Sequence, residues 1–273
     1  MKTILIAGGN SGIGLQAARE LLDHGHRLVL LGRDPGKGEA ALASFGAAAD
    51  RASFLAADLS THDGVREAAR RVLDQHDRID ALVHTTGVFT FQESRTADGL
   101  HPFFAVNYLS RYHLTQLLLP ALRQAERPVV LMMTAAIPPT DEMDFARFPE
   151  FSPFALSRDR KPIQLANHHY AAHLTRTEPG LGAGVVNAGS AKTDIMRIAP
   201  WYMRAAMKVL GPLVLDSVET SARNVVEAVR HDDWHSTPTY WGKPGRYEQR
   251  TPITLDTTTT QHLMDTSRKL TGA

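Results

Sequence analysis

The chain has 273 residues, of which 43% are hydrophobic and 22% charged, and its formal net charge is +1. These values are typical of a soluble globular protein, and the balanced charge gives no support for binding to nucleic acid or to an acidic membrane surface. The chain contains no cysteine, which excludes a disulfide framework, a zinc-thiolate site and a thiol nucleophile.

The N-terminal half alternates between short apolar runs and helical patterns. A strand over 4–7 leads into a glycine-rich turn and a helix over 15–24, which ends at Gly25. The next elements are expected in this order: strand 27–31, helix 37–49, strand 53–57, a helix from Ser60 or Thr61 to 76, and strand 79–84. The motif Thr96-Ala-Asp-Gly then leads into one long helix that runs through Arg123 with Asn107 in its interior.

The C-terminal half continues this alternation. The expected elements are strand 129–133, an irregular proline-containing segment over 135–161, a helix from Pro162 to 175, strand 183–186, a short helical insertion, helix 218–231, strand 239–241 and a helix entry at 257–260. Pro162 suits the first turn of its helix. Regular alternation of this kind predicts an α/β fold with a doubly wound parallel sheet, the Rossmann fold. Because no linker divides the chain, residues 1–273 are expected to form a single domain.

The insertion at about 190–216 carries bulky apolar residues, among them Trp201, Tyr202 and Met203. We interpret this insertion as a small apolar lid, which favours a bulky, flat or apolar substrate. Internal packing or a dimer contact would use the same residues, so these alternatives stay open.

The turn after the first strand has the spacing Gly8-x-x-x-Gly12-x-Gly14. Glycines let the backbone approach a pyrophosphate, and the helix N-terminus that follows supplies N–H donors and the positive end of the helix dipole. The pattern therefore predicts a dinucleotide site, with a purely structural tight turn as the alternative. The residues expected to contact the cofactor here are Gly8, Asn10, Ser11, Gly12, Ile13 and Gly14.

The second strand ends at Gly32 rather than at Asp or Glu. A carboxylate there would accept hydrogen bonds from a ribose 2′-hydroxyl, whereas Gly32 followed by Arg33 leaves room for a 2′-phosphate and offers it a guanidinium. We therefore expect NADP(H) as the cofactor, with a solvated surface arginine as the alternative reading. Asp58, followed by Leu59, is expected to accept from an adenine amino group, to cap the next helix, or to do both.

With these residues in view, the chain resembles the short-chain dehydrogenase/reductase family, and within it the retinol-dehydrogenase-like branch. The similarity covers nearly the whole length and is carried by AGGNSGIG at 7–14, LGRDPGKGE at 31–39, ADLS at 57–60, LVHTTGV at 82–88, VNYLSRYHLTQLLLPAL at 106–122, LAN at 165–167 and AKTDI at 191–195. The resemblance implies hydride transfer between a nicotinamide and a carbonyl or an alcohol. It also implies that Thr85, Gly87 and Thr193 lie beside the cofactor.

Members of this family use an Asn, a Ser and a Tyr-x-x-x-Lys pair for general acid and base chemistry. In that pair the lysine lowers the pKa of the tyrosine, and the serine orients the carbonyl oxygen. The resemblance places Asn107 on the Asn, where it would anchor a water of the proton relay, with a polar helix kink as the alternative. It places Thr134 or Ala135 on the Ser, and Thr134 could still donate to a carbonyl.

The tyrosine and lysine themselves are not found where the resemblance expects them. Counting back from the matching Leu165-Ala-Asn167, these positions hold Arg160 and Gln164. A second register places Phe154 on the tyrosine, so the usual acid is missing in both. Arg160 holds its proton too tightly to act as an acid near neutral pH, although it could polarise a carbonyl or bind an acidic substrate.

Two histidines are weak candidates for a replacement acid. His168 lies one helical turn after Gln164, and His84 ends the fourth strand next to the expected cofactor. Tyr170 is on the same helix as Gln164 but should face elsewhere. For His168, interior packing is the more common role.

Three functions stay open from the sequence. The preferred one is an atypical NADPH-dependent ketoreductase of secondary metabolism acting on a bulky apolar or aromatic carbonyl, with proton delivery by water, by the substrate's hydroxyl or by a histidine. Losing the acid typically costs about 10²–10⁴-fold in rate, which slows such a reaction without forbidding it. The alternatives are a redox-silent cyclase or isomerase and a non-catalytic NADP(H) sensor.

The remaining expectations concern partners and location. We expect a small-molecule substrate, no bound metal, and no nucleic-acid or membrane partner. Because family members commonly associate through the long helices that flank the sheet, we expect a homo-oligomer, either a dimer or a tetramer. The short N-terminal apolar run does not resemble a signal peptide, so the expected location is cytoplasmic.

Overall fold

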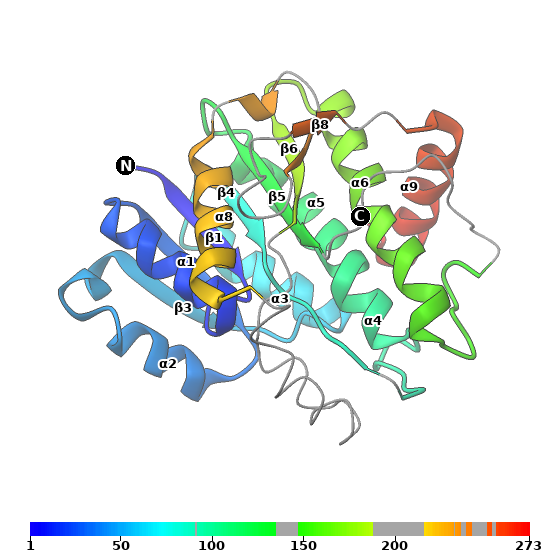
Figure 1. Ribbon diagram of the computed structural model, residues 1–273, viewed down its shortest axis with the longest axis horizontal. Helices are drawn as coiled ribbons and strands as arrows, with labels where there is room; N and C mark the ends of the chain where they lie inside the picture. Colours follow the sequence, from blue (N-terminus) through cyan, green and yellow to red (C-terminus); the bar gives the residue numbers. More distant parts are fainter. Residues whose placement is uncertain are drawn as a thin grey trace.

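One sheet organises the chain. The computed structural model describes residues 1–90, 92–134, 147–187, 216–231, 233–235, 239–241, 250–252 and 255–273. Its strands are β1 (Thr3–Ala7), β2 (Arg27–Gly32), β3 (Ala52–Ala56), β4 (Ala81–His84), β5 (Val129–Thr134), β6 (Gly182–Asn187), β7 (Thr239–Trp241) and β8 (Arg250–Pro252). They lie in the order β3-β2-β1-β4-β5-β6-β7-β8 (Figure 1).

The strand order confirms the doubly wound α/β fold. Strands β1 to β7 pair in parallel, and the order reverses between β1 and β4, which is the switch point where ligands bind in such sheets. Strand β8 pairs antiparallel with β7 and was not predicted, so the sheet is parallel except at this edge.

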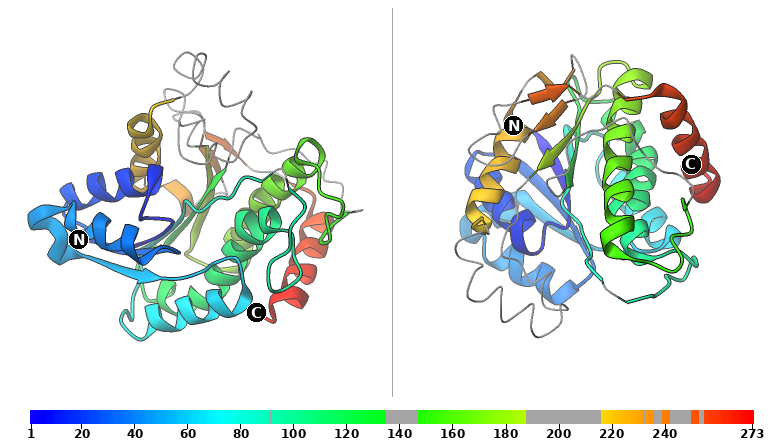
Figure 2. Two further views of the ribbon diagram at one scale, coloured as in Figure 1. Left: turned by 90° about the horizontal axis from the view of Figure 1, so that it is seen from below. Right: turned by 45° about the vertical axis from the view of Figure 1, so that its right-hand side comes forward.

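Helices cover both faces of the sheet. They are α1 (Gly12–Asp23), α2 (Pro35–Ala43), α3 (His62–Leu73), α4 (Pro102–Phe104), α5 (Ser110–Leu122), α6 (Leu156–Thr177), α8 (Val218–Arg230) and α9 (Thr257–Thr271), with the 3₁₀ turns η1 (Gly46–Arg51) and η4 (Asp233–His235) and the π-helical turn η2 (Ala105–Leu109). The right-hand view in Figure 2 shows α1 and α8 on one face and α6 and α9 on the other.

Side-chain alternation along the strands explains this layering. On β1, Ile4 and Ile6 pack with the α1 and α8 side chains, whereas Leu5 and Ala7 point to the opposite face. All four are fully buried. Strands covered on both faces are apolar at nearly every position, which is why the sequence runs are almost continuous rather than alternating.

Helix α6 begins earlier than its sequence predicts. It starts at Leu156, so Pro162 lies inside the helix, and the expectation that Pro162 opens it was wrong. The reason is tertiary: Asp159, which is 1% exposed, accepts from the Ala155 amide at 2.8 Å and from the Arg147 and Arg158 guanidinium groups at 3.1 and 2.8 Å. These contacts stabilise a helical turn ahead of the proline.

The long helix expected from about residue 100 to Arg123 is interrupted. It consists of α4, the π-helical turn η2 and α5, with Asn107 at the centre of η2. Such π turns often occur at functional sites. The helix entry at 257–260 is confirmed as the start of α9.

Two further observations concern the whole chain. No helix in the described ranges has both the length and the apolar character needed to cross a membrane. Most of the insertion that we interpret as a lid, at about 190–216, lies outside the described residues.

Candidate active site

The glycine-rich turn after β1 has the geometry of a nucleotide cradle. Gly8 and Gly12 have positive φ angles of 89° and 53°, a conformation that other residues rarely adopt. A Cβ on Gly14 would collide with the main-chain oxygen of Gly8, so α1 can approach β1 this closely only without a side chain there. The predicted tight turn is therefore present.

The N-terminus of α1 has free hydrogen-bonding capacity. Ser11 is its exposed N-cap residue and makes no side-chain hydrogen bond to the helix, and the first turn contains no acidic residue. Ile13 is buried and fixes the turn against the core. A helix N-terminus of this kind supplies amide donors and positive potential to a phosphate group. The space that Gly14 leaves open, together with the free amides of α1, therefore fits a dinucleotide pyrophosphate.

The end of β2 presents a cation without a competing carboxylate. Arg33 is exposed, and the side chain of Asp34 caps α2 by accepting from the Lys37 amide at 3.1 Å. Asn10 is 9% exposed and donates to the Asp34 main-chain oxygen at 3.2 Å. A Cβ on Gly32 would fall on the Asn10 side chain. Gly32 and Asn10 therefore fix the backbone that carries Arg33.

At the end of β3, Asp58 and Leu59 occupy the edge where adenine was expected. Asp58 is exposed, and one of its carboxylate oxygens accepts from the Ser60 amide at 3.0 Å. Thr61, not Asp58, caps α3, because its hydroxyl accepts from the Gly64 amide at 3.1 Å. Asp58 is therefore not the helix cap, and its contact with adenine stays a prediction.

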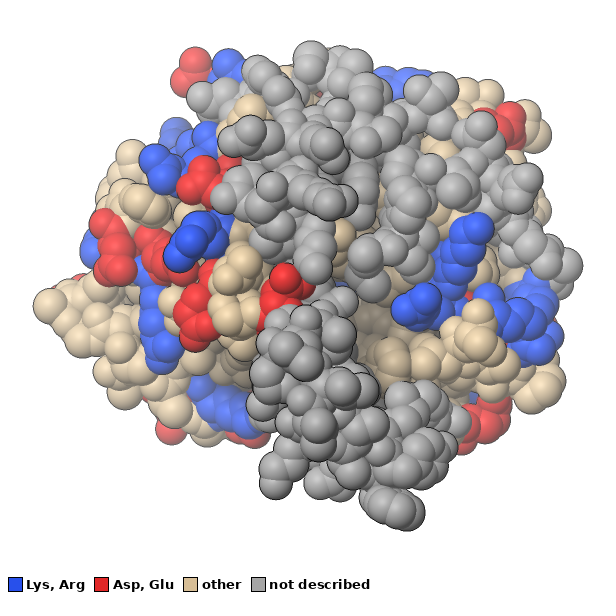
Figure 3. All heavy atoms as spheres, viewed as in Figure 1, with Lys and Arg blue, Asp and Glu red and all other residues tan. Residues whose placement is uncertain are grey.

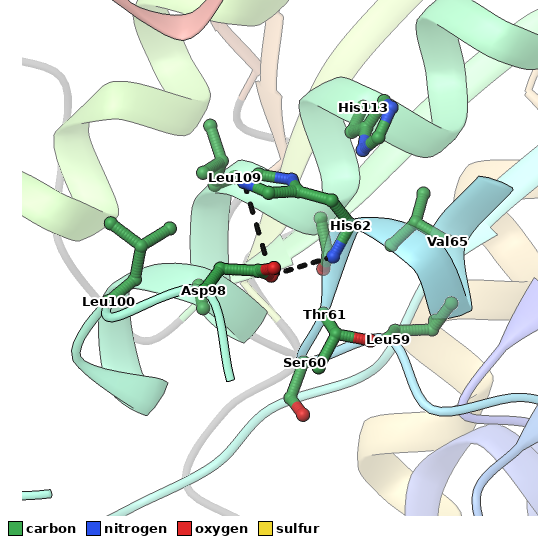
Figure 4. A pocket seen from close by; sticks show the side chains of 11 residues that line it. Leu59, Ser60, Thr61, His62, Val65, Asp98, Leu100, Leu109 and His113 are labelled. Carbon is green, nitrogen blue, oxygen red and sulfur yellow. Dashed lines mark hydrogen bonds and ion pairs between the residues drawn. The ribbon is translucent and has the colours of Figure 1, made fainter. Parts of the chain in front are cut away.

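A small pocket lies directly behind this edge (Figure 4), and Leu59 forms part of its wall. It has space for about one water molecule. The Asp98 carboxylate accepts from the His62 amide at 2.7 Å and lies 4.0 Å from the His62 ring. The buried His113 ring also lines the pocket, and neither of its nitrogens has a hydrogen-bond partner among the described residues.

The loop after β4 is tied to both sides of the site. The amide and the hydroxyl of Thr85 both donate to the Ala7 main-chain oxygen, each at 2.8 Å. Gly87 is exposed, and a Cβ there would lie 3.3 Å from the Asn107 side-chain oxygen. Thr85 therefore holds the end of β1 through its side chain, while Gly87 stays open for close approach of a ligand.

The side chain of Asn107 holds this loop on the opposite side. Its Oδ1 accepts from the Val88 amide at 3.0 Å and its Nδ2 donates to the Val88 oxygen at 2.9 Å. Its main-chain oxygen accepts from Asn167 Nδ2 at 3.1 Å. Asn107 therefore joins η2 to the loop after β4, and the water-anchoring role given by the resemblance stays a prediction.

Three further predicted residues lie on β5 and α6. Thr134 is the last residue of β5 and is 6% exposed. Arg160 is exposed on α6. Gln164 is 7% exposed, and its Oε1 is buried without a hydrogen-bond partner among the described residues. An unpartnered buried oxygen is costly, and a bound ligand with a donor group would relieve that cost.

The histidines considered as replacement acids lie in the interior. His84 is 1% exposed, and its Nε2 lies 2.9 Å from the Thr115 hydroxyl on α5, so its ring is engaged in the interior and its place beside the cofactor stays a prediction. Burial, together with the nearby Arg111 charge, keeps the pKa of His84 well below its ordinary value. His168 is fully buried on α6.

The tyrosines whose side chains are described do not provide a free phenol. Tyr108 bonds Ser267 at 2.8 Å, Tyr112 donates to the Ala273 oxygen at 3.1 Å, and Tyr170 bonds the Tyr112 main-chain oxygen at 3.3 Å. Tyr108 lies on η2, Tyr112 on α5 and Tyr170 on α6, and all three pack in the buried cluster that also contains α9 side chains. Thr193, predicted beside the cofactor, lies outside the described residues.

Sequence reasoning missed Arg111 and Asn167. Arg111, on the first turn of α5, is 3% exposed and donates to the Thr86 and Met133 main-chain oxygens, each at 2.7 Å, and to Asn167 Oδ1 at 3.2 Å. The sequence carries no signal for it, since a single arginine in a helix is typical of a solvent-facing position; the structure shows that the six residues from Ser110 to Thr115 are all buried. Among the described residues, no group of three His, Asp or Glu side chains could hold a metal ion.

Comparison with known proteins agrees with this geometry. The sequence model of the short chain dehydrogenase family matches residues 2–137. A polyprenol dehydrogenase of Mus musculus is 31% identical over 259 residues, which cover 90% of this chain and 75% of that protein. Retinol dehydrogenase 12 of Mus musculus is 36% identical over 126 residues, which cover 45% of this chain and 40% of that protein.

Solved structures show the same fold. An uncharacterized protein from Mycobacterium paratuberculosis superposes with a TM-score of 0.72 at 22% identity, over 100% of this chain and 94% of its own. A short chain dehydrogenase from Shigella flexneri, complexed with NADP, superposes with a TM-score of 0.66 at 17% identity, over 89% of this chain and 97% of its own. The sequence match to the polyprenol dehydrogenase establishes, in agreement with the fold, that this chain belongs to the short-chain dehydrogenase/reductase family of oxidoreductases, in the retinol-dehydrogenase-like branch.

Proposed function

We propose that this protein is an NADP(H)-dependent oxidoreductase that reduces a bulky apolar or aromatic carbonyl compound. The family uses NAD(H) or NADP(H), so the proposal concerns which of the two is bound, what is reduced and how the proton arrives. Bound NADPH would supply the hydride. The residues of this chain hold the dinucleotide, orient the carbonyl and limit the access of water.

The arrangement after β2 carries the choice of NADP(H). Gly32 offers no carboxylate to a 2′-hydroxyl, the Asp34 carboxylate is engaged in capping α2, and Arg33 is exposed beside them. A 2′-phosphate at this point would gain a charge-assisted contact with the guanidinium. The NADP complex of the Shigella flexneri relative agrees with this preference.

The substrate class follows from the relatives and from the sequence. Polyprenol and retinol, named for two related enzymes, are long apolar alcohols whose oxidised forms are carbonyl compounds. The segment at about 190–216, with Trp201, Tyr202 and Met203, has the composition of an apolar lid. Both features favour a bulky apolar substrate.

Proton delivery in this proposal does not use a tyrosine. The phenols of Tyr108, Tyr112 and Tyr170 are engaged in the helical layer, and His84 is buried against α5. The Thr134 hydroxyl, at the end of β5, would orient the carbonyl oxygen, and water or a substrate hydroxyl would give the proton. We place three further residues around the reacting carbonyl in this proposal: Asn107, Arg160 and Gln164.

Cofactor titration tests the first part of the proposal. Arg33→Ala should weaken NADPH binding at least tenfold and change NADH binding little, because a lost charged contact is worth about 1.5–3 kcal/mol. Arg27→Ala is the matched control, since Arg27 is also exposed but begins the same strand at its opposite end. Equal weakening of NADPH and NADH would rule out the 2′-phosphate contact.

Turnover tests the second part. Stopped-flow loss of NADPH absorbance with all-trans-retinal and a panel of aromatic ketones should show substrate-dependent oxidation of the cofactor. Binding of NADPH without turnover of any of these compounds would contradict the reductase assignment and favour a sensor or a redox-silent enzyme.

A further inference from the structure

Arg111 is a buried cation with no anionic partner among the residues that the structure describes. Its side chain is 3% exposed, and no acidic group among the described residues acts on it electrostatically. Burial lowers the pKa of Arg111 to about 9, and no nearby acid offsets that effect. The guanidinium therefore stays charged at neutral pH. Burying a charge without a counter-ion is strongly unfavourable, so such a group calls for a functional explanation.

The contacts of Arg111 are all with the elements that frame the candidate site. The last residue pair between β4 and β5 is His84 with Met132. Beyond that pair the two strands no longer share a ladder, and the Thr86 and Met133 oxygens instead accept from the two terminal nitrogens of Arg111, each at 2.7 Å. The guanidinium thus bridges the ends of β4 and β5.

Both bonded oxygens belong to peptide units that continue directly into predicted site residues. The Thr86 carbonyl is part of the peptide unit that leads to Gly87, and the Met133 carbonyl is part of the unit that leads to Thr134. Asn167 extends the contact to α6, because its Oδ1 accepts from Arg111 while its Nδ2 donates to the Asn107 oxygen. The positive charge is therefore one peptide unit from Thr134.

Two unsatisfied oxygens lie on the segments that Arg111 joins. The Thr86 hydroxyl, next to one bonded carbonyl, and Gln164 Oε1, on α6, are both buried without hydrogen-bond partners among the described residues. Arg111 Nε is also unpartnered. Among the described residues, this buried region has the Arg111 charge, no carboxylate within ion-pair distance of it, and in the Thr86 hydroxyl a free donor, which together suit an anionic oxygen atom. Gln164 Oε1 can only accept, so it does not contribute to that preference.

We propose that Arg111 is a positioning residue that fixes the ends of β4 and β5 and gives the candidate site a positive potential favouring an oxyanion beside Thr134. For the reduction proposed above, on which this part rests, hydride addition to the carbonyl carbon moves the π electron pair onto the oxygen. The resulting alkoxide then takes a proton from water. Arg111 lowers the energy of that alkoxide without touching it.

A single thiol at position 134 tests the potential without substrate or cofactor. Because the chain has no cysteine, Thr134→Cys introduces its only thiol, whose thiolate absorbance can be titrated between pH 5 and 8.5, where Arg111 remains mostly charged. An unperturbed thiol titrates near 8.5, and apolar burial alone raises that value. We expect the position-134 thiol to titrate below 8.5 despite its burial.

Two further variants separate charge from structure. Adding Arg111→Gln to Thr134→Cys should reduce the thiolate fraction at pH 7 at least fivefold, whereas adding Arg111→Lys should largely retain it. Ser267→Cys, in a fully buried position on α9, is the control, and its titration should not respond to Arg111→Gln. Circular dichroism checks that each variant is folded.

The outcomes are decisive even if one variant does not fold. If the thiol of Thr134→Cys, with Arg111 unchanged, titrates at or above pH 8.5, this result alone overturns the proposal. An equal response of the position-267 thiol would show a general loss of structure and would also overturn it. Failure of the reductase assay together with a lowered thiol pKa at position 134 would refute the proposed function and leave the Arg111 potential supported.

Discussion

Replacing His113 with leucine should make the protein more resistant to acid. The His113 ring is 1% exposed and lines the pocket behind Leu59, and its nitrogens have no hydrogen-bond partner among the described residues (Figure 4). Burial lowers the pKa of His113 to about 4, with smaller contributions in the same direction from His62 and Arg66 and an opposing one from Asp98. The native protein therefore keeps this ring neutral.

The pH window follows from the two states of this ring. In the unfolded chain the pKa of His113 is 6.5, so below that pH the unfolded state binds a proton at His113 that the folded state does not bind. The free energy of unfolding is thus unaffected above pH 6.5 and falls as the pH drops toward about 4. At pH 5 the solution is about 1.5 pH units below the pKa of the unfolded chain, so the free energy of unfolding is lower by about 2 kcal/mol than at neutral pH.

His113→Leu removes this titration and fits the apolar side of the pocket, which includes Val65 and Leu109. Urea unfolding followed by circular dichroism at pH 7.5 and 5.0 gives the drop in the free energy of unfolding between the two conditions. The drop should be about 2 kcal/mol smaller in His113→Leu than in the parent chain. His24→Gln, at an exposed position, is the control and should leave the drop unchanged. An identical drop in His113→Leu and the parent would refute this reasoning.

Two other substitutions test the cradle and the packing of the C-terminal helix. Gly14→Ala should abolish NADPH binding measured by nicotinamide fluorescence, since the new Cβ would collide with the Gly8 oxygen and lie 2.5 Å from the Thr85 hydroxyl; an unchanged Kd would contradict the cradle. Tyr108→Phe should lower the free energy of unfolding by about 1 kcal/mol in thermal denaturation, because it removes the buried 2.8 Å bond to Ser267. If Tyr108→Phe lowers the free energy of unfolding by the same amount when Ser267 is already replaced by alanine, the bond between the two side chains does not contribute to stability.

The parallel sheet was predictable because its signal is local. Each buried strand is a short apolar run, and the turn at Gly8 to Gly14 depends on residues that are close in sequence. The start of α6 was not predictable, because it depends on Asp159 binding Arg147, twelve residues earlier. A rule based on Pro162 alone cannot include that contact.

The candidate site likewise has one part that local sequence predicts and another that depends on contacts distant in sequence. Local spacing was sufficient for the phosphate cradle, whereas the role of Asn107 depends on Val88, nineteen residues away in sequence. Arg111 was missed because an arginine between Ser110 and Tyr112 looks like a solvent-facing residue of a helix. Only the assembled fold shows that its terminal nitrogens lie between Thr86 and Met133.

The C-terminal helix limits how copies of this chain can associate. Helix α9 packs on α5 and α6 through buried apolar side chains, including Leu263 and Met264, and His169 on α6 bonds Thr260 at 2.8 Å. A second bond, also 2.8 Å long, ties Ser267 of α9 to Tyr108 on the adjoining turn η2. A second copy could contact that face of α5 and α6 only by displacing α9, which would expose these side chains to water. We therefore propose that a homo-oligomer of this chain forms through surfaces other than the face covered by α9, in contrast to the family expectation of contact through the long flanking helices.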